Sequence, residues 1–327
     1  MSEKSSRRDL LQQTALVAGA AALVTKKAQA QGSAGAASSE PAWKHLFPAG
    51  FRNERIKTTG AEINTVIGGS GPPVLMFHGA PQSLITWRLI APDLAKDFTL
   101  VMCDLRGYGD SSKSPDTDDH RNYSKRPMAL DGVEVMKHLG YDRFNMVGHD
   151  RGGRVGLRMA WDHPDKVQKL VVMDIVPANY LYSHVTIEFV RAYFHWFNYL
   201  RAAPGPEDEL FKTNQAQLAR STNDVQREYL RTSATMENIH AMCEDYRASA
   251  SIDLKLDNDE MKAGKKVQCP LLTLWAATGA MGTQYDVLGI WKEYGVNVTG
   301  KGLPGNHSLQ ESAPKETLAE IQKFLKA

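Results

Sequence analysis

The chain has 327 residues, 42% of them hydrophobic, and 39 basic against 37 acidic residues leave a formal net charge of +2. A chain of this size can bury one large core, or a core with a small cap. The basic residues are scattered and form no stripe, which argues against a nucleic acid or an anionic membrane surface as the partner.

The amino terminus is expected to lie outside the fold. Residues 1–31 combine a charged start, a short alanine-rich apolar run and small residues at Ala28 and Ala30, as an export signal does. The stretch "SRRDLL" resembles a twin-arginine signal, with Leu10 where that pattern more often has phenylalanine. The apolar run is too short to span a bilayer. We expect export to the periplasm and a linker over residues 32–42; the alternative is an unstructured tail that happens to contain two arginines.

From residue 43 onward, short apolar runs alternate with amphipathic helical stretches, which predicts an α/β fold with a mostly parallel sheet. The expected strands are "VLMFHG", "TLVMCDLRG", "RFNMVGH", "KLVVMDI" and "PLLTLWA". Residues 178–253 change to aromatic-rich helical sequence and are expected to form a helical cap. The core is then made of residues 43–177 and 254–327.

The three cysteines, Cys103, Cys243 and Cys269, are an odd number without CxxC spacing. We interpret them as small buried hydrophobic residues rather than a disulfide framework or a metal site.

The stretch Gly148-His149-Asp150-Arg151-Gly152 fits a nucleophile elbow, a tight strand-to-helix turn that lifts its central side chain above the sheet. A strand-like run precedes it, a helical stretch follows it, and "FHGAPQ" lies upstream where an oxyanion-hole loop belongs. The alternative is that Asp150 merely caps the following helix.

An aspartate at the elbow limits the kind of carbon atom that the enzyme can attack productively. Attack on a carbonyl would give an anhydride, whereas attack on a saturated carbon gives an ester that water can then hydrolyse. Asp150 therefore predicts displacement at a saturated carbon that carries a halide or an epoxide oxygen.

The second step needs a base, and His307 lies late in the chain, after a strand-like run, where the order nucleophile, acid, histidine places it. Asp174 ends the strand-like run "KLVVMD" and is the expected partner that orients His307. The next acid after "PLLTLWA" is Asp286, some ten residues beyond that run. The alternatives are a surface loop histidine for His307 and a turn-capping aspartate for Asp174.

Arg151 and Arg154 follow the nucleophile closely, and Arg154 lies one helical turn past Asp150. They are expected to hold a substrate carboxylate and so to place its α-carbon near Asp150, because a planar guanidinium matches a carboxylate. The alternative is that both arginines form structural salt bridges at the elbow.

These residues resemble the fluoroacetate (haloacetate) dehalogenases of the α/β-hydrolase superfamily, from about Leu46 to the carboxyl terminus. The matches are G-H-D-R-G-x-R at residues 148–154, D-I-x-P at Asp174, the pair His195-Trp196, and Tyr246 within C-E-D-Y-R. Haloalkane dehalogenases and epoxide hydrolases usually carry tryptophan where this chain has Arg151.

The resemblance implies that His195, Trp196 and Tyr246 donate hydrogen bonds to the departing halide without adding charge. It also implies an oxyanion hole made of the backbone N–H groups of Ala80 and Arg151.

The chain departs from the family at Ala80, where an aromatic residue is typical, and at Ser308 and Gln310, where the family usually reads H-F-L-P. These departures predict a wider or wetter pocket and favour a larger 2-haloacid, or a substrate without halogen, over strict fluoroacetate specificity.

The expected activity is hydrolysis of the carbon–halogen bond of a short 2-haloacid, with no cofactor and no metal. One alternative is an epoxide hydrolase, with Tyr246 and either Tyr193 or Tyr199 as acids. Another is an exported carboxylate-binding protein without turnover. The expected partner is a small-molecule substrate, without nucleic acid or stable membrane association after export; the sequence leaves a homodimer open.

Overall fold

The computed structural model describes residues 42–327. The expected export signal, and all of the expected linker except Ala42, lie outside the described residues. Within residues 42–327, no helix is both long and apolar enough to span a membrane.

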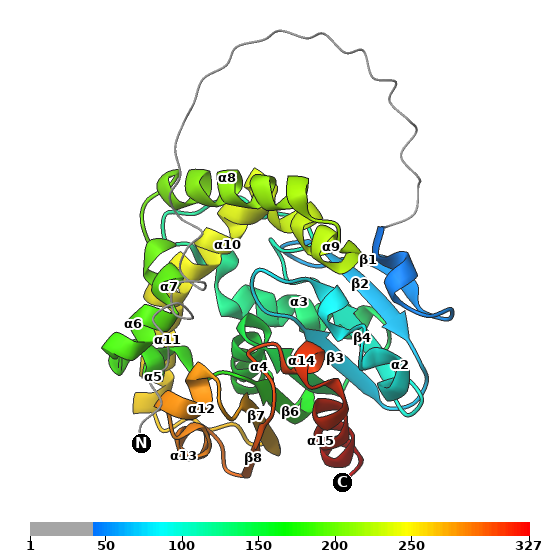
Figure 1. The fold of residues 1–327 in the computed structure, drawn as a ribbon. Coiled ribbons are helices and arrows are strands. Elements are labelled where there is room, and N and C mark those ends of the chain that lie inside the picture. The colour runs from blue at the N-terminus through cyan, green and yellow to red at the C-terminus, as the bar shows by residue number, and fades with distance from the viewer. Residues whose placement is uncertain (1–41) are drawn as a thin grey trace, which may run out of the picture. The chain divides into compact units, whose positions relative to one another are not determined.

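The centre of the fold is an eight-stranded sheet with the order β1-β2-β4-β3-β5-β6-β7-β8 (Figure 1). The β1–β2 and β2–β4 pairs are antiparallel, and every pair from β4 to β8 is parallel. The strands are β1 (Arg52–Lys57), β2 (Glu62–Gly68), β3 (Pro73–Phe77), β4 (Thr99–Cys103), β5 (Phe144–His149), β6 (Val167–Met173), β7 (Leu271–Ala276) and β8 (Val298–Leu303).

Helices cover both faces of the sheet, and alternate side chains of each strand enter two different cores. On β3, Leu75 packs into the core that includes Val155, while its neighbour Met76 packs into the core that includes Leu94 and Ile321. The helices of these layers are α2 (Ala91–Leu94), α3 (Lys125–His138), α4 (Arg151–Asp162), α12 (Ala280–Gln284), α13 (Val287–Tyr294), α14 (Leu309–Ser312) and α15 (Pro314–Lys326). Three 3₁₀ turns, η1 (Ala42–Leu46), η2 (Leu84–Trp87) and η3 (Arg121–Tyr123), complete them.

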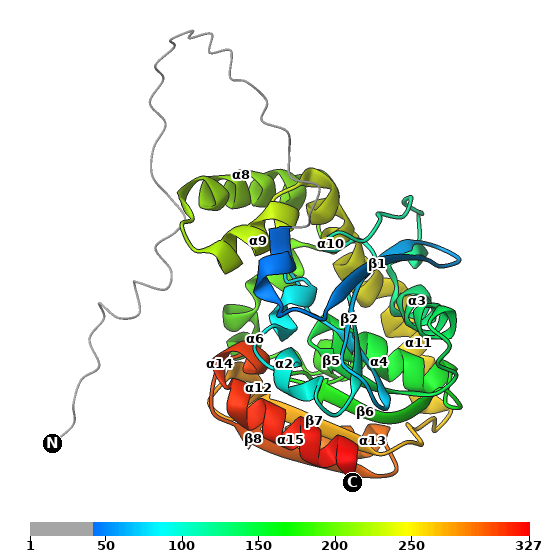
Figure 2. The same cartoon turned by 90° about the vertical axis from the view of Figure 1, so that its right-hand side faces the viewer.

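A helical region is inserted between β6 and β7. Both views show α8, α9 and α10 lying together on one side of the molecule (Figures 1 and 2). Its elements are α5 (Ala178–Ser183), α6 (Ile187–Ala192), α7 (Phe194–Asn198), α8 (Gly205–Arg220), α9 (Asp224–Ser233), α10 (Met236–Ala248), the π-helical turn η4 (Ser249–Asp253) and α11 (Leu254–Lys262). The expected fold, an α/β hydrolase with a mostly parallel sheet and inserted helices, is confirmed; the exact domain limits stay a prediction.

The turn from β5 to α4 is sharp, and two glycines make it possible. Asp150 lies between the two elements with φ 47° and ψ −113°, a conformation that side-chain-bearing residues rarely adopt. A Cβ at Gly148 would lie 2.4 Å from the carbonyl oxygen of Gly152, and one at Gly152 would lie 2.3 Å from that of Phe77. Backbone therefore touches backbone on both sides of Asp150.

Replacing Gly152 by alanine should destabilise the protein, because the added methyl group meets the Phe77 carbonyl and not a flexible side chain. We expect Gly152→Ala to lower the free energy of unfolding by about 1–3 kcal/mol in urea titrations. The control is Gly205→Ala at the start of α8, where the nearest heavy atom is Arg201 Nη2 at 3.5 Å. Equal stability of the two variants would contradict the close approach at the elbow.

Candidate active site

The carboxylate of Asp150 is buried and its two oxygens have different partners. Oδ1 accepts a hydrogen bond of 3.1 Å from the backbone N–H of Ala80. Oδ2 accepts one of 3.2 Å from Arg154 Nη1 and lies 3.8 Å from His307 Nε2. Oδ2 is thus the oxygen that faces both the arginine and the histidine.

Charge around Asp150 keeps it ionised. Burial raises the pKa of this carboxyl group, but His307 and Arg154 oppose burial strongly enough that its pKa falls well below the usual range. A carboxylate that is both buried and ionised is a competent nucleophile at neutral pH.

His307 follows β8 and lies against Asp174, which directly follows β6. The Nδ1 of His307 is 2.6 Å from Asp174 Oδ2, and Asp174 Oδ1 accepts 2.8 Å from the backbone N–H of Ala276. Because a carboxylate accepts, Nδ1 donates, and the Nε2 lone pair of the neutral ring faces Asp150. Asp286 instead caps α13, accepting 3.0 Å from the N–H of Gly289.

The environment of His307 raises its pKa. Burial alone would lower that pKa, but the hydrogen bond to Asp174 and the charge of Asp150 outweigh burial. The structure therefore brings together the three residues expected to carry catalysis, Asp150, Asp174 and His307.

Arg151 is held by a carboxylate that sequence reasoning missed. Its Nε donates 2.7 Å to Asp245 Oδ2, and its Nη2 donates 2.8 Å to both Oδ1 and the backbone oxygen of Asp245 and 2.7 Å to Ser249 Oγ. For Arg151, the alternative of a structural salt bridge therefore applies to the Nε and Nη2 atoms of the guanidinium. Asp245 also accepts from Tyr108 and Lys125. Two features of the sequence could have identified Asp245. It directly precedes Tyr246, and the buried Arg151 needs a carboxylate as its counter-charge.

One donor on each arginine remains unpaired. Among the described residues, Arg151 Nη1 and Arg154 Nε are buried and have no hydrogen-bond partner. The rest of Arg154 bonds to Asp150 and, at 3.5 Å, to the carbonyl oxygen of Val176. An unpaired buried donor costs about 1–3 kcal/mol, so these two nitrogens have N–H groups free to donate to a bound anion.

The three residues expected around the halide lie together on the inserted helices. His195 and Trp196 are on α7 and Tyr246 is on α10, with ring centroids 6.3 Å apart for His195–Tyr246 and 5.6 Å for Trp196–Tyr246. The guanidinium of Arg151 lies 4.1 Å from the Tyr246 ring centre, and that of Arg154 lies 4.8 Å from Trp196.

Burial keeps these donors uncharged. It lowers the pKa of His195 and raises the pKa of Tyr246 well above its usual value. Around neutral pH the imidazole is therefore neutral and the phenol is protonated, and both retain an N–H or O–H to donate.

A cavity of about 290 Å³ adjoins these rings. It is lined by Ala80, Pro81, His195, Tyr199, Met242 and Tyr246. Of the three departures noted in the sequence, Ala80 borders this cavity. Gln310 is instead completely buried against Thr86 and His149, and Ser308 accepts 3.2 Å from Gln82. None of these three contacts is with a residue that lines the cavity.

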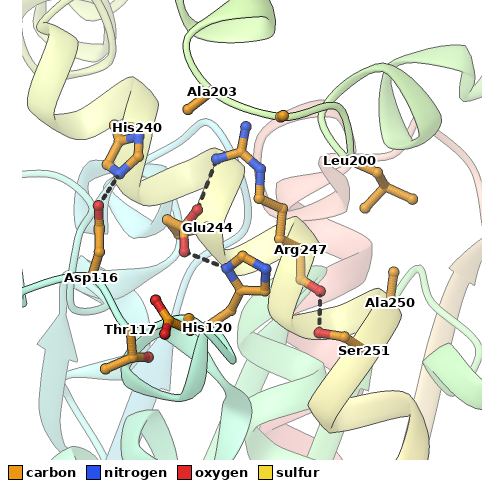
Figure 3. A pocket seen from close by; sticks show the side chains of 12 residues that line it. Asp116, Thr117, His120, Leu200, Ala203, His240, Glu244, Arg247, Ala250 and Ser251 are labelled. Atoms are coloured by element: carbon orange, nitrogen blue, oxygen red, sulfur yellow. Dashed lines mark hydrogen bonds and ion pairs between the residues drawn. The ribbon is translucent and has the colours of Figure 1, made fainter.

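A larger cavity, of about 620 Å³, contains none of the expected site residues (Figure 3). His240, Glu244, Arg247 and Ser251 border it along one stripe of α10 and η4, whereas Met242 and Tyr246 face the smaller cavity. Most of its charged groups are paired with one another, as His240 with Asp116 and Glu244 with both His120 and Arg247. Size alone does not mark it as the reactive site.

Comparison with known proteins shows the family to which the chain belongs. A family model described as the alpha/beta hydrolase fold matches residues 72–297. The chain is 39% identical over 288 residues to a fluoroacetate dehalogenase of Burkholderia sp, covering 84% of this chain and 94% of that protein. It is 31% identical over 286 residues to a soluble epoxide hydrolase of Corynebacterium sp. (strain C12), covering 81% and 94%.

Among solved structures, a protein of Nostoc sp PCC 7120 provisionally assigned as an alpha/beta hydrolase superposes with a TM-score of 0.80 at 44% identity, covering 84% of this chain and 98% of that one. The match of the family model over most of the chain, the two relatives and the sheet order agree: this chain belongs to the α/β-hydrolase family.

Proposed function

We propose that this protein hydrolyses the carbon–halogen bond of short 2-haloacids. The observation that carries the proposal is the pair of buried, unpaired donors, Arg151 Nη1 and Arg154 Nε, beside an ionised carboxylate. Two such donors match a substrate carboxylate, and Asp150 matches a saturated carbon next to it.

In the first step, the substrate carboxylate accepts hydrogen bonds from the two free arginine donors. Oδ2 of Asp150 attacks the α-carbon from the side opposite the halogen, forms the new C–O bond and inverts that carbon. The C–halogen bond breaks, and the halide leaves with both electrons toward the donors of His195, Trp196 and Tyr246. The product of this step is an ester on Asp150.

In the second step, His307 Nε2 removes a proton from water as the water oxygen adds to the ester carbonyl carbon. The charge then develops on Oδ1, which the N–H of Ala80 already contacts and toward which we assign the N–H of Arg151 as well. Collapse of this intermediate releases the 2-hydroxy acid, whose alkoxide oxygen takes the proton from His307. The second proton of the water remains on the Asp150 carboxyl group and is lost to solvent, which restores the carboxylate. The atoms balance without a cofactor.

The volume of the cavity supports substrates larger than haloacetate. A space of about 290 Å³ beside Ala80 and Met242 has room for an apolar substituent on the α-carbon. A substituted acid such as a 2-halopropionate therefore fits the proposal at least as well as an unsubstituted one.

Epoxide hydrolysis is a second candidate because Tyr199 and Tyr246 both line the cavity. Burial raises the pKa of Tyr199 to about 12 and that of Tyr246 well above its usual value, so both phenols keep the proton that an epoxide oxygen would need. An epoxide offers no carboxylate to the two unpaired arginine donors, which is why we favour the haloacid.

The purified protein should release halide from chloroacetate, bromoacetate, fluoroacetate and 2-chloropropionate, measured by ion chromatography, and should leave styrene oxide unchanged. Asp150→Asn should reduce halide release by roughly 10⁴-fold or more, because it removes the nucleophile. Hydrolysis of styrene oxide without halide release would replace the proposal with an epoxide hydrolase. Saturable binding of chloroacetate without any release would instead indicate a binding protein.

The two steps should differ in their dependence on pH. The pKa of Asp150 lies far below neutrality, so ester formation should be flat from about pH 6 to pH 9. Protonated His307 cannot accept a proton from water, so ester hydrolysis should fall as the pH drops through the pKa of His307, which Asp174 still raises in the ester.

Rapid-quench mass spectrometry of the peptide that contains Asp150 would measure both steps. His307→Asn serves as the control, since its ester should accumulate at every pH. The assignment of the base would be wrong if ester hydrolysis in the unmodified protein were equally fast on both sides of the His307 titration.

A further inference from the structure

The loop that carries His307 is tied to the core through His149, the residue before Asp150. The Nε2 of His149 lies 2.8 Å from the backbone carbonyl oxygen of His307, and the two ring centroids are 4.8 Å apart. A carbonyl oxygen only accepts, so Nε2 of His149 carries the proton and donates it. In the neutral ring Nδ1 is then an acceptor.

Gln310 faces that acceptor. Its side chain is completely buried, and its Nε2 lies 3.3 Å from His149 Nδ1 and 2.6 Å from Thr86 Oγ1. An amide N–H can donate to an unprotonated Nδ1, whereas a protonated Nδ1 would leave two donors facing each other. Gln310 therefore favours the one tautomer of His149 that reaches the carbonyl of His307.

The arrangement also keeps charge away from the base. Burial, followed by repulsion from His307, lowers the pKa of His149 to about 4, so this ring stays neutral when His307 takes up a proton. A second imidazolium at this separation would oppose that protonation.

Gln310 makes these contacts at a cost. Its Oε1 is buried without a hydrogen-bond partner among residues 42–327, which is unfavourable in a protein core. The position is also one of the chain's departures from the family pattern, which usually has proline there. A buried amide whose oxygen is unpaired suggests that the contacts of its nitrogen have a function.

We propose that Gln310 and His149 are positioning residues for the base: Gln310 selects the tautomer of His149, and His149 holds the backbone of His307 in place for attack on the ester. The inference rests on the proposed function in one respect, since a base matters only where water is activated. The arrangement of the two side chains can be tested in the resting protein without any substrate.

The test compares Gln310→Met, which keeps a similar volume without the N–H donor, with the unmodified protein. Imidazole ¹⁵N spectra should show His149 as a single neutral Nε2–H tautomer in the unmodified protein and as a mixture of tautomers in the variant. Ester hydrolysis from chloroacetate should slow by about tenfold, as expected for one lost hydrogen bond, while ester formation stays within about twofold. The matched control is Gln322→Met on α15, whose amide lies 3.3 Å from Asp97 at a distance from the site, and it should change neither reading.

A second pair of variants keeps the test decisive if Gln310→Met does not fold. The amide in His149→Gln can still donate to the carbonyl of His307 and accept from Gln310, so ester hydrolysis should stay within about threefold, whereas His149→Leu should lose about tenfold. An unchanged tautomer and unchanged hydrolysis in Gln310→Met, or equal losses in ester formation and ester hydrolysis, would overturn the inference. If the unmodified protein releases no halide, the proposed function fails, and the ¹⁵N result alone then decides whether Gln310 selects the tautomer.

Discussion

The site depends on keeping one carboxylate ionised in a buried turn. Moving a charge out of water is costly unless it is paired and hydrogen-bonded. Asp150 meets this condition through the N–H of Ala80, the guanidinium of Arg154 and the nearby imidazole of His307. The glycines of the elbow place the carboxylate where all three can reach it, and the same three groups are those that the proposed displacement and ester hydrolysis require.

Arg151 links the site in the core to the inserted helices. Its guanidinium belongs to α4 of the core, but Asp245 and Ser249, which hold it, belong to α10 and η4 of the insertion. The π-helical turn η4 begins at Ser249, and irregular turns of this kind are frequent at functional sites. With its Nε and Nη2 donors occupied, Arg151 presents the unpaired Nη1 group in a set direction. Breaking a buried pair of this kind is strongly destabilising, so the direction of Arg151 and the docking of the insertion are coupled.

Much of this arrangement was predictable because its residues follow one another in recognisable patterns. The five expected strands are all present, since strands covered on both faces are continuously apolar. Strands β1 and β8, "RNERIK" and "VTGKGL", were missed because edge strands are exposed to water and carry polar residues; β2, "EINTVIG", was missed as well. Asp245 and Gln310 were missed as site residues for a different reason. Each acts on a residue distant in the chain, and only the folded structure brings a buried arginine or a buried histidine to them.

Single turnover in H₂¹⁸O would show whether Asp150 forms the proposed covalent ester with the substrate carbon. With protein in excess over chloroacetate, we expect ¹⁸O in the carboxylate of Asp150 and unlabelled oxygen in the hydroxyl group of the product, because water attacks the ester carbonyl. Label in the product hydroxyl after one turnover, with none on Asp150, would mean that water attacks the α-carbon directly and that Asp150 is not the nucleophile.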